Sequence, residues 1–256
     1  MASRSTTQLE LQGIADAPPK RATWGGRRAG AGRKPKANPG YVRHHRRAKH
    51  AKSRPVHITM RARRGLPSFR EQLILQMMTK ILRNQTGLGK VKRKYTDVFR
   101  VLHFSIQDNH VHVMVEADDS RALRSGVSGL VIAFARQLAK LFGRKKLKVW
   151  AERFHSREVG SPQDVVNTLN YIFQNYKKHG AVTFGHGIVD RFSSAKQFDG
   201  WQQKALYPTL LDETSFTMQG PEPWAPARPD TWLVSTGWKK YHPPLDTRSK
   251  PAPHAH

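Results

Sequence analysis

The chain has no cysteine among its 256 residues. Disulfides, thiolate zinc sites and a cysteine nucleophile are therefore excluded, and nothing opposes a reducing cytoplasm. No apolar run approaches the length of a membrane span, and the first residues lack the hydrophobic segment of a secretory signal. We therefore expect an intracellular protein that has no membrane partner.

Acidic residues are also scarce, because 18 Asp and Glu stand against 45 Lys and Arg, for a formal net charge of +27. Such an excess implies a polyanionic partner, and nucleic acid is the first candidate. A membrane surface is a weaker candidate, because no long amphipathic basic helix stands out. The length allows one sizeable core, or a core with tails.

The lack of acidic residues is most marked near the N-terminus, where residues 17–70 contain no Asp or Glu and 17 Lys or Arg. Residues 24–35 are rich in Gly and Arg without a hydrophobic period, which is typical of a disordered arm. The end of this stretch resembles an AT-hook, which lays Arg into a narrow minor groove. A generic phosphate-binding tail explains it equally well. We predict a basic DNA-binding arm over residues 1–54, with these contact residues: Arg27, Arg28, Arg33 and Lys34.

From residue 55 onward, alternating and helical hydrophobic periods predict an α+β domain. We expect strands near 56–60, 98–107, 110–117 and 148–159, and helices that begin at Ser68, near Ser120 and after Ser161. Ser68 and Glu71 have the spacing of a capping box, and Ser161 is an N-cap before Pro162. This order predicts a ferredoxin-like (split βαβ) antiparallel sheet with helices on one face plus an added last helix. We assign residues 55–200 to this domain and 201–256 to a C-terminal extension, partly packed and frayed at its end.

A pair of histidines, His110 and His112, follows the tight Asp108-Asn109 turn. Residues i and i+2 of a strand point to the same side, so both imidazoles could bind one metal ion. A two-residue loop would pair Gln107 with His110, Ser105 with His112 and His103 with Met114. This register predicts one polar face, and an opposite apolar face with these residues: Leu102, Phe104, Ile106, Val111, Val113 and Val115. For an isolated His-x-His, a solvent-facing strand with idle histidines remains the common explanation.

The helix after Ser161 adds two polar groups. Its apolar arc comprises Val165, Val166, Leu169, Ile172, Phe173 and Tyr176. Tyr171 lies off this arc, and Asn175 lies one turn further on the same polar side. Two imidazoles and one amide oxygen suit Mg²⁺ or Mn²⁺ with open positions for substrate oxygens. For Tyr171 alone, a surface tyrosine without a role is the alternative.

Three segments together resemble the single-tyrosine HUH transposases: residues 109–112, 149–154 and 171–175. The nearest branch is the REP-associated tyrosine transposases, and the resemblance extends from about Pro55 to Tyr241. It implies that His110 and His112 bind the metal with Asn175 as third ligand, and that Tyr171 is the nucleophile. The chain departs from the common Tyr-Ile-His-x-Asn-Pro pattern, since it has Phe173 at the histidine position and Tyr176 at the proline position.

The resemblance implies a metal-dependent DNA transposase that cleaves and rejoins single-stranded hairpin DNA of palindromic repeats through a 5′-phosphotyrosine intermediate. No nucleotide cofactor is expected, because the covalent bond conserves the phosphodiester energy. Arg61, Arg63 and Arg64 are expected to track the DNA backbone together with the arm. His103 and Gln107 are further candidates on the polar face, although packing explains His103 equally well. We expect a bacterial, nucleoid-associated cytoplasmic protein, either a monomer or a homodimer.

Other functions remain open. A replication initiator or relaxase would share the histidine motif, but such proteins often carry helicase domains or three-histidine sites, and the chain has no helicase motif. A catalytically inactive, domesticated hairpin-binding protein would share every feature of the fold. An RNA-binding protein is less favoured, because the strands lack the stacked aromatic pattern of RNA-recognition sheets.

Overall fold

The computed structural model describes residues 48–85, 97–144, 146–179, 187–203, 205 and 227–249. Every described residue belongs to one compact unit within residues 41–256. The four predicted DNA contacts of the arm, with the AT-hook, lie outside the described residues.

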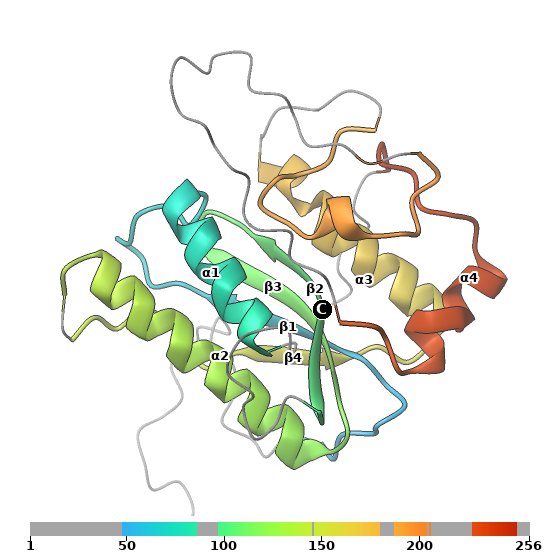
Figure 1. The fold of residues 1–256 in the computed structure, drawn as a ribbon, viewed down its shortest axis with the longest axis horizontal. Helices are drawn as coiled ribbons and strands as arrows, with labels where there is room; N and C mark the ends of the chain where they lie inside the picture. The colour runs from blue at the N-terminus through green and yellow to red at the C-terminus, as the bar shows by residue number, and fades with distance from the viewer. Residues whose placement is uncertain are drawn as a thin grey trace, which may run out of the picture. The chain divides into compact units, whose positions relative to one another are not determined.

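Four antiparallel strands form the sheet: β1 (Val56–Arg61), β2 (Phe99–Ile106), β3 (His110–Ala117) and β4 (His155–Glu158). Their order across the sheet is β2-β3-β1-β4 (Figure 1). The two central strands come from the first and third positions in the chain, as a split βαβ fold requires. The predicted α+β, ferredoxin-like architecture is therefore confirmed.

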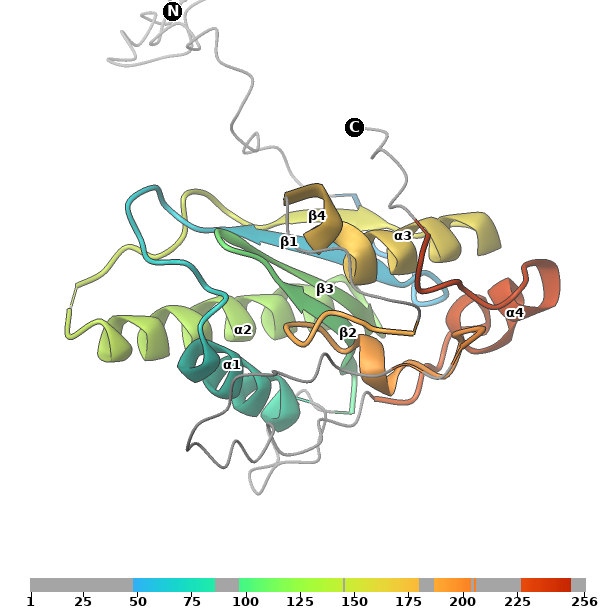
Figure 2. The same cartoon turned by 90° about the horizontal axis from the view of Figure 1, so that it is seen from above.

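Helices cover both faces of this sheet, as Figures 1 and 2 show. On one face lie α1 (Gln72–Gln85) and α2 (Ser120–Leu141), packed on the apolar residues of β1, β2 and β3. On the other face lies α3 (Pro162–Gln174), which is the added helix. Among the described residues, no helix is long and apolar enough to cross a membrane.

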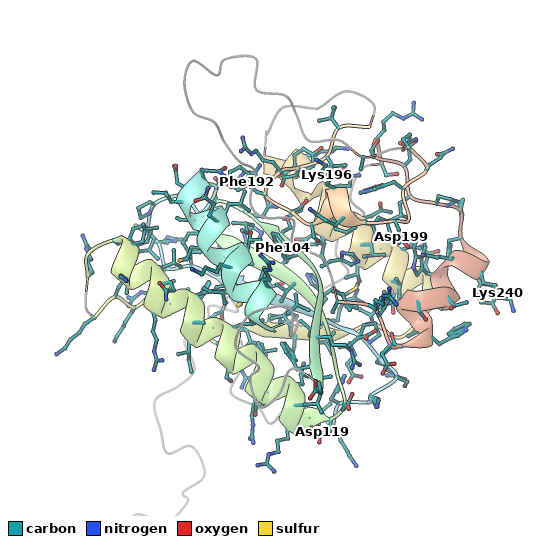
Figure 3. The ribbon with its side chains drawn as sticks, viewed as in Figure 1. Phe104, Asp119, Phe192, Lys196, Asp199 and Lys240 are labelled. Atoms are coloured by element: carbon teal, nitrogen blue, oxygen red, sulfur yellow. The ribbon has the colours of Figure 1, made fainter. Side chains whose placement is uncertain are left out.

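The starts of the helices follow from local hydrogen bonds. Asp119, labelled in Figure 3, caps α2 by accepting from the Ala122 amide at 2.6 Å. Ser161 caps α3 by accepting from the Asp164 amide at 3.1 Å, as predicted. The prediction that a capping box at Ser68 starts the first helix was wrong, because α1 begins only at Gln72. The Ser68 hydroxyl instead donates to the carboxylate of Asp108 in the hairpin turn at 2.7 Å.

The fourth strand and the exposed face of the first helix need comment. The strand predicted near 148–159 is ordered as β4 only from His155 to Glu158, after an isolated bridge between Ala62 and Trp150. On α1, Leu73 is 64% exposed, whereas Ile74 and Leu75 are buried and face the core.

A β-bulge in β2 changes one predicted face. Val101 pairs with Val115 and His103 with Met114, so Leu102 is an extra residue in β2. Leu102 consequently lies with Met114 in the core beneath α3, and not with the apolar residues that face α1 and α2. The prediction for Leu102 was wrong because a bulge shifts the alternation by one residue.

The segment after α3 lies along the free edge of β2. The Ile106 amide donates to the Phe192 carbonyl at 2.8 Å, and Ser105 forms an isolated bridge with Ser193. Arg70 fixes this segment to the start of α1 by donating to both oxygens of buried Asp190, at 2.9 and 2.8 Å. Bidentate geometry of this kind is the strongest form of the ion pair.

The described part of the C-terminal extension packs on the same domain. A π-helical turn (Leu233–Gly237) leads into α4 (Trp238–Tyr241), and Trp238 is buried in the core beneath α3. Buried Glu116 of β3 accepts from the Thr231 amide at 3.0 Å and from its hydroxyl at 2.6 Å. The boundary at residue 200 itself stays a prediction.

We predict that Glu116→Gln lowers the free energy of unfolding by about 1.5–3 kcal/mol, because hydrogen bonds to a charged acceptor become bonds to a neutral one. Urea unfolding measures the change. Glu71→Gln, at an exposed position, is the control and should stay within about 0.5 kcal/mol of the parent. Equal stability of the two variants would show that Glu116 does not hold the extension.

Candidate functional site

Asn175 and the two histidines of β3 come together where α3 ends over the sheet. Asn175 Nδ2 lies 3.3 Å from His110 Nε2 and 3.4 Å from His112 Nε2. In the sequence, Asn175 is 65 residues from His110 and 63 residues from His112, so the fold brings the three side chains together. Asn175 is buried, so its carboxamide is fixed rather than solvated.

The outer nitrogens of both imidazoles are held by neighbouring side chains. His110 Nδ1 lies 2.8 Å from Asn109 Oδ1, and because that oxygen only accepts, the proton of the neutral ring is on Nδ1. His112 Nδ1 lies 3.1 Å from Thr59 Oγ1, a hydroxyl that can accept a hydrogen bond from the ring. When both rings carry their proton on Nδ1, each Nε2 keeps its lone pair toward Asn175, and this is the tautomer in which Nε2 binds a metal.

The three groups fit a divalent cation. As placed, the two amide hydrogens of Asn175 can donate to the two Nε2 lone pairs. A half-turn of the carboxamide, which is nearly symmetric in shape, puts Oδ1 at the same position. Two nitrogens and one oxygen would then face one ion. Within the described residues no cluster of three or more His, Cys, Asp or Glu side chains could hold a metal, so a site here depends on Asn175.

Tyr171 stands beside these imidazoles. Its ring centroid lies 5.0 Å from that of His112 and 5.9 Å from that of His57, both in edge-on geometry. Partial burial raises the pKa of Tyr171 above its ordinary value. Tyr176 is buried with the apolar residues of α3, as predicted from the helical arc. Of these two tyrosines, Tyr171 is the one whose ring packs against the histidines.

His57 is a member of the site that the sequence analysis missed. Its Nε2 lies 3.1 Å from His112 Nδ1, and its side chain is buried. In β1 it alternates with Val56 and Ile58, which places it on the polar face with Thr59. The signal was present in this alternation, but only the pairing of Thr59 with His112 shows that β1 lies beside the histidine strand.

His103 and Gln107 share the polar face but lie apart from this cluster. His103 packs edge-on against Phe173 and Phe198, at centroid distances of 5.1 and 5.4 Å. Burial lowers the pKa of His103 to about 3. These contacts favour packing, which is one of the two explanations that the sequence leaves open for His103. Gln107 is buried and donates to the Ser105 hydroxyl at 2.7 Å.

Three exposed arginines border the site at the end of β1: Arg61, Arg63 and Arg64. Arg61 is the register partner of His110, so its backbone adjoins the histidine pair. The Ala62 amide donates to the Asn109 carbonyl at 2.8 Å, which ties this basic loop to the hairpin turn. The predicted DNA contacts of the domain thus lie next to the predicted ligands.

Comparison with known proteins finds a family model that matches about half of the chain. Residues 56–175 match the family model described as "Transposase IS200 like". A protein of Haemophilus influenzae described as a REP-associated tyrosine transposase is 32% identical over 95 residues, which is 33% of this chain and 53% of that protein. The chain thus spans about half the length of this curated relative.

Two solved structures are also similar. The structure of a REP-associated tyrosine transposase bound to a REP hairpin has 18% identity and a TM-score of 0.46, over 68% of this chain and 96% of that one. A transposase structure from Deinococcus radiodurans R1 has 15% identity and a TM-score of 0.34, over 58% of this chain and 99% of that one.

We predict that buried His103 makes the fold sensitive to acid. The unfolded chain binds a proton at this residue below about 6.5, whereas the folded chain does so only below about 3. Stability should therefore fall as the pH falls through this window, by up to about 1.4 kcal/mol per pH unit from this one group. His103→Phe, which keeps an aromatic ring at this position, should lose that part of the slope. An unchanged slope in urea unfolding at pH 7 to 4 would contradict the assignment.

Proposed function

We propose that the chain is a metal-dependent transposase that cleaves and rejoins single-stranded hairpin DNA, because residues 56–175 match the IS200-like transposase family model. The observation that carries this proposal is the convergence of Asn175 on His110 and His112 with Tyr171 beside them. The activity of the whole protein is part of the proposal, since its curated relative is matched over 53% of its length.

His110 Nε2, His112 Nε2 and Asn175 Oδ1 would hold a Mg²⁺ or Mn²⁺ ion, with outer-shell support from Asn109, Thr59 and His57. Such an ion, when bound, polarises the scissile phosphate and supplies a fixed positive charge next to it. The orientation of the two imidazoles is set by the contacts of their Nδ1 atoms with neighbouring side chains.

Tyr171 is the nucleophile in this proposal. Its oxygen attacks phosphorus, the phosphorus–O3′ bond breaks, and the leaving strand departs as a 3′-hydroxyl while the protein keeps a 5′-phosphotyrosine. Attack by another 3′-hydroxyl reverses the step and joins strands. Partial burial raises the pKa of Tyr171, so the phenolate fraction, and with it cleavage, should increase as the pH rises through the neutral range.

The proposed partner is single-stranded or hairpin DNA of palindromic repeats in a bacterial nucleoid. The net charge of +27 requires a polyanion, and exposed Arg61, Arg63 and Arg64 lie at the edge of the site. The name of the Haemophilus influenzae relative associates that protein with REP elements, which supports a palindromic target here. A monomer and a homodimer are both compatible with this chemistry.

We predict that Tyr171→Phe abolishes formation of a denaturation-resistant protein–DNA adduct, because the variant has no oxygen to attack phosphorus. The assay incubates labelled single-stranded hairpin DNA with protein and Mg²⁺, followed by denaturing electrophoresis. Tyr176→Phe is the matched control, since it removes a hydroxyl from the same helical region that does not face the imidazoles, and it should retain the adduct.

An adduct that persists in Tyr171→Phe would remove this residue as nucleophile. Absence of an adduct with the parent protein on every palindrome of the host genome, together with retained hairpin binding, would identify an inactive DNA-binding protein instead. The two failures are thus distinguishable in one gel and one binding curve.

We predict that Asn175→Ala weakens Mn²⁺ binding by about 10-fold or more, because it removes one of three ligands. Electron paramagnetic resonance of free Mn²⁺ measures the affinity without DNA, and EDTA should abolish adduct formation. Asn167→Ala is the control, because this carboxamide of the same helix bonds Gln163 and not the histidines. Equal Mn²⁺ affinities of the two variants would exclude Asn175 as a ligand.

A further inference from the structure

Two large aromatic side chains of the C-terminal extension are exposed to solvent. Trp232 is 52% exposed and Tyr241 is 59% exposed. Their rings lie edge to face, with centroids 6.3 Å apart. Lys240 adjoins them, since its Nζ lies 5.6 Å from the centroid of the Tyr241 ring. We call these three side chains the aromatic platform. Rings of this size are usually covered, so a pair of them on the surface points to a ligand.

The aromatic platform is fixed to the domain on both sides of Trp232. The preceding residue, Thr231, is bound by buried Glu116 of β3, and Trp238 after it is only 1% exposed. A Cβ atom on Gly237 would lie 2.7 Å from the Trp232 ring, so glycine is needed for the ring to lie this close to the backbone. Trp232 therefore presents its exposed surface in a fixed orientation, and a ligand would bind without first ordering the side chain.

The surroundings of the platform are basic. Residues 231–245 contain two lysines and no Asp or Glu. Lys239 is paired with Asp199 at 3.0 Å. Lys240, labelled in Figure 3, is exposed and takes part in none of the ion pairs formed by the described residues. A cation beside exposed rings complements a ligand that has both a planar ring and an anionic group.

Unpaired nucleotides have this combination of groups. Proteins that bind single strands stack the bases on aromatic side chains and hold the backbone with cations. In a duplex the base faces are already stacked on one another, so paired DNA offers the platform little. A protein partner could also cover aromatic rings, but the net charge of +27 favours a polyanion.

The platform lies on the side of the sheet that carries the candidate site. Trp238 packs in the core beneath α3, and α4 lies beside α3 in both views (Figures 1 and 2). Glu116, which binds Thr231, follows His110 by six residues in β3, a separation of about 20 Å. Stacked nucleotides advance by about 3.4 Å each, so about six of them would bridge the site and the platform.

We propose that Trp232 and Tyr241 stack with unpaired bases of the DNA strand that continues from Tyr171, and that Lys240 contacts a phosphate of the same strand. This assignment rests on the proposed function. It gives the C-terminal extension a role in substrate binding, in which the unpaired flank of a hairpin is held at a distance from the chemistry and without preference for a base.

The test uses the Tyr171→Phe background, so that DNA is bound without being cleaved. Trp232→Ala/Tyr241→Ala removes both rings, and the matched control Trp232→Phe/Tyr241→Phe keeps a ring at each position. Three labelled DNAs share one hairpin and differ in the flank: about 2 unpaired nucleotides, which are too few to reach the platform, about 12, or about 12 abasic nucleotides. The flank is on the side of the hairpin that gives the parent the higher affinity. Fluorescence anisotropy measures Kd across a series of salt concentrations.

We expect the parent to bind the long flank about 10-fold or more tightly than the short one, and to bind the abasic flank more weakly than the long one. The alanine variant should lose this gain with an unchanged slope of log K against log salt, because stacking releases no counterions. The phenylalanine variant should keep the gain. Lys240→Gln should instead reduce the slope by about 0.7, as the loss of one phosphate contact to a single strand implies.

Equal affinities of the alanine and phenylalanine variants for the long flank would overturn the assignment. An abasic flank that the parent binds as tightly as the long one would also overturn it, and this comparison needs no variant. Both results leave the proposed function intact if the protein that retains Tyr171 forms its adduct on the short-flank hairpin. A parent that binds none of the three DNAs would refute the proposed function itself. Thermal unfolding of each variant within about 2 °C of the parent shows that the fold is retained.

Discussion

The antiparallel pairing of β1 with β3 is the constraint on which the rest of the structure depends. It sets Thr59 opposite His112 and Arg61 opposite His110, and a shift by one residue would exchange the faces of every side chain in these strands. Ile58 and Val113 then point to α1 and α2, so burial of apolar area fixes the register. Because side chains alternate along a strand, this burial also places the polar residues on the other face. Hydrophobic packing on one face of the sheet thus determines the position of the imidazoles on the other.

The site also depends on α3 staying on the polar face, where few apolar residues can hold it. Leu102 and Met114 supply apolar surface beneath the helix, and the β-bulge is what turns Leu102 to this side. Buried Trp238 of the C-terminal extension packs in the same cluster. Asn175 reaches the histidines only while this second core is intact, so residues far from the chemistry control its geometry.

Local patterns in the sequence predicted the hairpin register and the two sides of α3. The two-residue Asp108-Asn109 turn determines which residues of the two strands pair, and the helical period determines which residues of α3 are buried. Two features escaped prediction because they depend on contacts between distant segments. His57 becomes a neighbour of His112 only through pairing of strands 55 residues apart. His103 is a packing residue because Phe198, 95 positions later, covers it. The resemblance added roles for single residues that no periodicity could assign.

The scarcity of acidic residues has a structural counterpart. Several of the few carboxylates are bound to internal partners: Glu116 holds the C-terminal extension, Asp190 holds Arg70, and Asp119 caps α2. Carboxylates used in this way cannot neutralise the exposed arginines of the β1 loop or the cations at the end of α2. The excess of 45 Lys and Arg over 18 Asp and Glu already makes the chain positive, and the internal use of these carboxylates leaves fewer of them to neutralise the surface. A polyanion would relieve the repulsion among these cations, which agrees with the DNA partner that we propose.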